Sequence, residues 1–107
     1  MPTRVNALDF LLLVDSGAAY TGLTRRAVET LGLKPRLQPG KRITPAHGRA
    51  VTLPTVMVNS LVVGGHDVQG LEVLVLDLPL ELRIDGLLGM DFLSCAWALQ
   101  EGTGFFR

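Results

Sequence analysis

Runs of apolar residues, bounded by Gly, Pro, Asn and Asp, follow one another along most of the chain and predict mainly β structure. Residues 8–14 are apolar at nearly every position, which predicts a strand buried on both faces that ends at Asp15-Ser16-Gly17. Residues 51–63 predict a long strand. Because Gly64-Gly65 and the two residues after them tolerate positive φ, residues 68–76 are expected to fold back as its antiparallel partner.

Helical spacing is limited to one short segment after the first strand. Thr24 is a suitable N-cap and Gly32 a suitable stop for a helix of two turns, whose apolar positions are Leu23, Ala27, Val28 and Leu31. Residues 34–48, rich in Pro, Gly and basic side chains, predict a loop and then an exposed hairpin with its tip near 45–48.

The last third of the chain predicts shorter elements. Residues 84–88 form an apolar segment that ends at Gly89 and is followed by a short helical turn around 91–93. Residues 96–99 and 105–106 are compatible with one more small hairpin around Glu101-Gly102.

Composition narrows the class of protein. The 107 residues are 48% hydrophobic, enough for one core, and their number leaves room for a single domain over residues 1–107. Ten Lys and Arg balance ten Asp and Glu, so the basic surface of a nucleic-acid binder or an anionic-membrane binder is missing. The one cysteine, Cys95, lies in no metal-binding motif. We therefore expect neither nucleic acid nor a metal as a partner.

No segment resembles a membrane anchor or a leader peptide. The longest purely apolar run, residues 10–14, is far too short to cross a bilayer, and the N-terminus lacks a basic leader and a small-residue cleavage site. We expect the chain as given to be soluble and cytoplasmic, unless an upstream segment has been trimmed away.

Two motifs carry the candidate chemistry. Asp15 lies within Leu12-Leu13-Val14-Asp15-Ser16-Gly17-Ala18, where a carboxylate leaves an apolar strand and enters a tight turn. About 70 residues later comes Gly86-Leu87-Leu88-Gly89-Met90-Asp91-Phe92-Leu93. Each motif alone is a weak signal, but average residue usage gives both together in fewer than about one chain in a hundred.

This pair of motifs resembles the retropepsin-like aspartic proteases, and the resemblance covers most of the chain, from about Phe10 to Leu93. The form Gly-Leu-Leu-Gly-Met-Asp-Phe-Leu is more similar to cellular, bacterial and retrotransposon members than to retroviral ones. The resemblance implies a mainly β fold, a closed barrel with one short helix after the active-site turn and a short helical turn after the Leu-Leu-Gly motif.

The resemblance also implies a reaction. Each chain of such an enzyme supplies one catalytic Asp, so Asp15 would act in a homodimer with the active site on the twofold axis. The two carboxyls would share a proton, activate a water and hydrolyse a peptide bond of a polypeptide substrate, with no metal or cofactor.

The neighbours of Asp15 take their roles from the same resemblance. Ser16 would hydrogen-bond across the axis, and Gly17 would allow the two turns to approach closely. Ala18 has no hydroxyl to donate to the carboxylate, so we expect a pH optimum displaced from strongly acidic toward weakly acidic or neutral. Substrate-binding residues would be Ala19, Tyr20 and Leu87, together with Ala46, His47 and Gly48 at the tip of a flap that closes over the peptide.

Some features depart from the family pattern. Only 14 residues precede Asp15, and the tail after Leu93 is short and ends in Phe105-Phe106-Arg107. Either the dimer is built differently or the chain is a domain of a longer protein. Two alternatives to the enzyme remain: a catalytically silent retropepsin-like module for dimerisation or peptide binding, and a small β-rich regulator with an accidental Asp-Ser-Gly turn.

Overall fold

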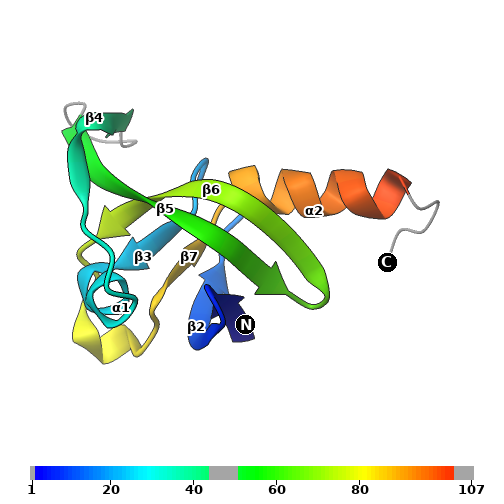
Figure 1. Cartoon of the computed structure of the whole chain (residues 1–107), viewed down its shortest axis with the longest axis horizontal. Coiled ribbons are helices and arrows are strands. Elements are labelled where there is room, and N and C mark those ends of the chain that lie inside the picture. The colour runs from blue at the N-terminus through cyan, green and yellow to red at the C-terminus, as the bar shows by residue number, and fades with distance from the viewer. Residues whose placement is uncertain (1, 44–50, 103–107) are drawn as a thin grey trace.

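The computed structural model describes residues 2–43 and 51–102 and contains seven strands and two α-helices (Figure 1). The strands are β1 (Pro2–Val5), β2 (Leu8–Val14), β3 (Gly22–Thr24), β4 (Arg36–Ile43), β5 (Val51–Val63), β6 (His66–Leu76) and β7 (Gly86–Leu88). The helices are α1 (Arg25–Thr30) and α2 (Met90–Gly102), with one 3₁₀ turn, η1 (Leu80–Leu82).

Six of the strands close into a barrel. They pair in the order β1-β2-β7-β3-β6-β5, and β5 returns to β1 through Arg4 opposite Val62 and Val5 opposite Leu61. β4 pairs with β5 outside this ring. The β2–β7 and β3–β6 pairs are parallel and the others antiparallel. The expectation of a mainly β, closed-barrel fold is confirmed.

The β5–β6 hairpin contains the two longest strands of the sheet and runs across the barrel in Figure 1. Gly64 and Gly65 form its two-residue turn with φ of +56° and +86°, the positive values that such a turn requires. Residues 51–63 form the predicted strand. Its partner begins at His66, two residues earlier than expected, because Val63 pairs directly with His66 across the turn.

The first hairpin joins β1 to β2 through Asn6 and Ala7, which have φ of +47° and +70°. The Asn6 side chain accepts hydrogen bonds from the backbone N–H groups of Asn59 and Ser60 at 2.8 and 3.2 Å, and the Asn6 N–H donates to the Ser60 carbonyl at 2.9 Å. These three bonds fasten the turn to β5 and so help to close the barrel.

The burial of β2 differs from the prediction. Leu12 is fully buried and Phe10 packs against the core, but Leu11 and Leu13 point to the opposite face and are 44% and 53% exposed. Val14, at the end of the strand, is 43% exposed. A continuous apolar run predicts burial on both faces of a strand. In the single chain, other residues cover only the face of β2 that points into the barrel.

The helices confirm one prediction and correct another. Thr24 caps α1, since its hydroxyl accepts from the Ala27 N–H at 3.2 Å, and Gly32 follows the helix with φ of +71°. Leu23, expected at the start of this helix, lies in β3 instead.

After the Leu-Leu-Gly motif, α2 is much longer than the expected turn at 91–93. Residues 96–99, suggested for a small hairpin, belong to this helix. No Gly or Pro interrupts the sequence from Met90 to Glu101, and its Ala, Leu, Met and Gln residues favour a helix. Among residues 90–96 of the helix, Phe92 and Ala96 are buried, four residues apart on the side facing the barrel. Phe105 and Phe106 lie outside the described residues.

Within the segment 34–48, expected to be a loop followed by a hairpin, the chain becomes extended at Arg36 and forms β4, which ends at Ile43. Lys41 to Ile43 pair with Leu53 to Val51, as in a hairpin, and the register shifts between Arg36 and Lys41, where Pro39 and Gly40 occur. The expected hairpin tip near 45–48 lies outside the described residues. Among the residues that the structure describes, no helix has the length and apolar character needed to span a membrane.

Candidate active site

Asp15 begins a tight turn directly after β2. Its carbonyl accepts from the Ala18 N–H at 3.1 Å, and its side-chain Oδ1 accepts from the Gly17 N–H at 3.0 Å. A Cβ at residue 17 would lie 3.3 Å from that same oxygen, so glycine keeps this approach open. Asp15 is half-buried, whereas Ser16 and Gly17 are exposed. The turn therefore fixes one carboxylate oxygen while its outer residues face away from the barrel.

β7 lies beside the Asp15 turn. The Asp15 N–H donates to the Leu88 carbonyl at 2.9 Å, and the strands pair in parallel with Val14 opposite Leu88 and Leu13 opposite Leu87. Leu88 is fully buried behind the turn. Leu87 is half-buried on the other face of the sheet, the face that Leu13 shares.

Leu13 and Leu87 together form an apolar surface next to Asp15. The sequence predicts Leu87 as a pocket residue and Leu13 as a core residue, because the apolar run of β2 predicts burial on both faces. The parallel pairing to β7, between segments more than seventy residues apart, is what brings the two leucines together.

The glycines of the second motif allow β7 to run unusually close to the segment that follows the Asp15 turn. A Cβ at Gly89 would lie 2.4 Å from the carbonyl carbon of Tyr20, and one at Gly86 would lie 2.1 Å from the Gly22 carbonyl oxygen. No side chain fits either position without a shift of backbone. The spacing Gly-Leu-Leu-Gly therefore has a direct steric cause.

A network of hydrogen bonds joins the segment 18–21 to the start of α2. The Met90 and Asp91 N–H groups donate to the carbonyls of Ala18 and Ala19 at 2.8 and 3.1 Å. The Asp91 carboxylate accepts from the N–H and the hydroxyl of Thr21 at 2.9 and 2.7 Å. In the sequence, Asp91 lies inside the second motif but no local signal assigns it a role, and Thr21 belongs to neither motif.

The remaining predicted site residues are only partly placed. Ala19 and Tyr20 follow the turn and are exposed, so they are accessible beside Asp15. Ala46, His47 and Gly48, the expected flap tip, lie outside the described residues. Across residues 2–43 and 51–102, no three His, Cys, Asp or Glu side chains gather as the ligands of a metal would.

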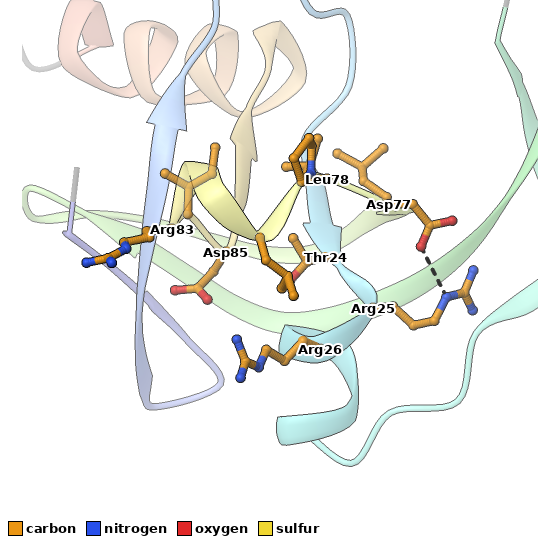
Figure 2. A pocket seen from close by; sticks show the side chains of 11 residues that line it. Thr24, Arg25, Arg26, Asp77, Leu78, Arg83 and Asp85 are labelled. Atoms are coloured by element: carbon orange, nitrogen blue, oxygen red, sulfur yellow. Dashed lines mark hydrogen bonds and ion pairs between the residues drawn. The ribbon is translucent and has the colours of Figure 1, made fainter.

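A groove of about 410 Å³ opens between the start of α1 and the segment 76–85 (Figure 2). Arg25 pairs with Asp77 at its rim at 3.5 Å, and the Asp85 carboxylate accepts from the Leu11 N–H at 2.8 Å. β2 and β7 run in parallel away from this point toward Asp15. The groove therefore lies at the opposite end of these strands from Asp15, and none of the predicted site residues lines it.

Comparisons with known proteins agree with this arrangement. The family model described as aspartyl protease matches residues 1–92. A search among curated proteins finds no significant match. Among solved structures, a retropepsin-like aspartic protease from Rickettsia conorii is 25% identical with a TM-score of 0.61, over 88% of this chain and 67% of that one.

Two further structures share the fold. The EIAV protease, solved in complex with the inhibitor HBY-793, is 20% identical with a TM-score of 0.65, over 100% of this chain and 88% of that one. The retroviral protease-like domain of Ddi1 from Leishmania major is 20% identical with a TM-score of 0.50, over 87% of this chain and 72% of that one. The family match over most of the chain and the shared barrel show that this protein belongs to the aspartyl protease family, as a retropepsin-like member.

Proposed function

We propose that this chain is an aspartic endopeptidase that works as a homodimer, with the Asp15 residues of two copies forming the catalytic pair. Membership of the aspartyl protease family supports peptide hydrolysis as the reaction. The observation that carries the proposal is the placement of Asp15: half-buried at the end of β2, with one oxygen held by Gly17, in a turn whose outer residues are exposed. Such a turn can meet its equivalent in a second copy across a twofold axis.

The chemistry requires a second acid. A single carboxyl cannot accept the proton of a water and protonate the substrate carbonyl at the same moment. Each chain carries one Asp-Ser-Gly turn, so the second carboxyl comes from the second copy. Two carboxyls a few ångströms apart share one proton, as the pairs of aspartic proteases do, which gives one general base and one general acid.

The reaction then proceeds in two balanced steps. The ionised Asp15 takes a proton from a water held between the two carboxyls, the water oxygen attacks the scissile carbonyl carbon, and the protonated Asp15 of the second copy donates to the carbonyl oxygen. The diol intermediate collapses as the first carboxyl gives its proton to the amide nitrogen and the second takes one from a diol hydroxyl. The C–N bond breaks, and both carboxyls regain their starting states.

Exposed apolar side chains next to the turn support association of two copies. Val14 immediately precedes Asp15 and is 43% exposed. Met90 is 40% exposed, and its N–H bonds to the Ala18 carbonyl of the same turn. Both border the Asp15 turn, so a second copy that docks on this turn would remove them from water.

The substrate is an extended polypeptide. We assign the surface formed by Leu13 and Leu87 to an apolar side chain next to the scissile bond, since both leucines border Asp15 and are incompletely buried. Ala19 and Tyr20 contact the substrate backbone, and the flap with Ala46, His47 and Gly48 at its tip closes over it. The peptide thereby adds a strand between the flap and the surface around the Asp15 turn.

Cleavage by the purified chain tests the proposal. The chain is incubated with a denatured protein and a peptide library between about pH 3 and about pH 8, beside Asp15→Asn. Asp9→Asn is the matched control, because Asp9 is an 82% exposed side chain on the same strand that pairs only with Arg4 in the described structure. Cleavage by the wild type and by Asp9→Asn, with none by Asp15→Asn, is expected. Peptide binding without cleavage would favour the silent module instead.

Mixing wild type with Asp15→Asn tests the shared site. If both acids are needed and the copies pair at random, an equal mixture contains roughly one quarter fully wild-type dimers and keeps roughly one quarter of the activity at the same total concentration. A monomeric site predicts roughly one half, because each wild-type chain then acts alone. Sedimentation of the same samples reports the dimer directly.

A further inference from the structure

We propose that Asp91 is a positioning residue for the reaction, acting through Thr21 to hold the segment that carries Asp15. This inference rests on the proposed function above. Asp91 Oδ1 accepts three hydrogen bonds: from the Thr21 N–H at 2.9 Å, the Thr21 hydroxyl at 2.7 Å and the Phe92 N–H at 2.7 Å. The two residues are 70 positions apart in the sequence, so this contact exists only in the closed barrel.

Thr21 is the part of the pair that the fold encloses completely. Its side chain is fully buried, and its hydroxyl donates to Asp91 while accepting from the Gly89 N–H at 3.1 Å. Its carbonyl also accepts from the Leu74 N–H at 3.0 Å. A hydroxyl can donate and accept at once, whereas Val would do neither and would leave buried groups without partners.

The pair controls the path of the chain from Asp15 to Thr21. This segment contains no helix or strand. β7 and α2 hold it by three backbone–backbone hydrogen bonds, Asp15 to Leu88, Ala18 to Met90 and Ala19 to Asp91, and by the bond from the Thr21 N–H to the Asp91 carboxylate. Asp91 is the residue that uses both its N–H and its side chain for this purpose. The Asp91 carboxylate therefore contributes two of the hydrogen bonds that hold the end of this segment at Thr21.

A carboxylate suits this position for two reasons. Hydrogen bonds to an ionised acceptor are shorter and stronger than those to a neutral one, which matches the distances of 2.7 to 2.9 Å. Asp91 also lies in the first turn of the 13-residue helix α2, where the helix dipole stabilises a negative charge. Both effects keep the oxygen in place while a substrate is bound.

Loss of the pair is expected to lower kcat more than it raises KM. The two Asp15 carboxyls must meet with an accuracy of a fraction of an ångström to share a proton and orient the water, and a displacement of about 1 Å costs about 100-fold in rate. The apolar surface of Leu13 and Leu87 belongs to regular strands, so binding of the peptide depends less on this loop.

The test compares kcat and KM for one peptide across Asp91→Ala, Asp91→Asn, Thr21→Val and Thr21→Ser. We expect Asp91→Ala and Thr21→Val to lower kcat about 10-fold or more, with KM within about threefold of the wild-type value. Asp91→Asn and Thr21→Ser keep the side-chain oxygens and are expected to retain most of the wild-type kcat. Asp77→Ala is the matched control, because that carboxylate is 83% exposed and pairs with Arg25 at the distant groove.

The double variant decides whether the two residues act as one unit. If they do, Asp91→Ala with Thr21→Val loses no more kcat than the worse single variant, whereas independent effects would multiply. Thermal unfolding identifies the folded variants, and if Asp91→Ala fails to fold, Asp91→Asn, Thr21→Ser and Thr21→Val carry the comparison. Folded variants with wild-type kcat would overturn the assignment. A wild-type chain that cleaves nothing would instead refute the proposed function.

Discussion

Replacing Gly89 with Ala tests the close approach on which the candidate site depends. The added Cβ would lie 2.4 Å from the Tyr20 carbonyl carbon, 2.5 Å from the Tyr20 oxygen and 2.9 Å from the Thr21 nitrogen. All three are backbone atoms that cannot rotate away as a side chain would. Either β7 or the segment 20–21 must move.

The size of the effect follows from these distances. Restoring ordinary contact needs a backbone shift of about 1 Å, and overpacking of this kind costs about 1–3 kcal/mol. The shift also weakens the bond from the Gly89 N–H to the Thr21 hydroxyl, 3.1 Å long, which contributes about 1 kcal/mol. We expect a loss of about 3 kcal/mol in the free energy of unfolding, or a fall in Tm of about 12 °C.

Urea and thermal unfolding followed by circular dichroism measure this loss. Gly70→Ala is the matched control, because Gly70 has φ of +66° but nothing within 4 Å of its Cβ position, so only the left-handed backbone costs energy, about 1–2 kcal/mol. Gly89→Ala is expected to be clearly the less stable of the two and to lose peptide cleavage. Equal stability of the two variants would refute the proposed steric role of Gly89.

Three further changes have definite expected outcomes. Asn6→Ala removes the acceptor for two β5 N–H groups at a residue with φ of +47°, so urea unfolding should show a loss of about 2–3 kcal/mol in the free energy of unfolding. The same change at exposed Asn59 is the control and should cost less than about 0.5 kcal/mol. Leu13→Ala shortens a side chain of the proposed apolar surface at a position that is 53% exposed. The KM for a peptide with an apolar residue at the scissile bond should therefore rise about threefold or more, with little change in Tm. An unchanged KM would show that Leu13 is not part of the site. Ala18→Ser adds a hydroxyl beside the ionised carboxylate and should move the pH–rate profile to lower pH, whereas a wild-type optimum below about pH 3.5 would contradict the reasoning about Ala18.

Local signals predicted several elements of this fold correctly. Gly64 and Gly65 indicate a two-residue turn because few other residues adopt positive φ there, and the turn fixes the register of the long hairpin. Thr24 and Gly32 mark the two ends of α1 by the same kind of reasoning, since each satisfies a backbone requirement of a helix terminus. In each case a few neighbouring residues determine the outcome.

Contacts between distant segments could not be predicted in this way. The exposure of Leu13 depends on what covers the outer face of β2, and the sequence of that strand looks the same whether a neighbour is present or not. The bond between Thr21 and Asp91 spans 70 residues, and neither residue type is unusual in its own segment. The motif around Asp15 marks the candidate site, but it does not show which residues hold the Asp15 turn in place.

The pairing of β2 with β7 affects how the chain folds while it is being synthesised. Asp85, whose carboxylate accepts a hydrogen bond from the Leu11 N–H, lies 74 residues after Leu11, and β7 begins at the next residue. A nascent chain still lacking that stretch contains the Asp15 turn without the strand that pairs beside it, so the turn takes its folded geometry only after β7 has been synthesised. The order of the strands therefore ties completion of this turn to the last of the seven strands that the structure describes.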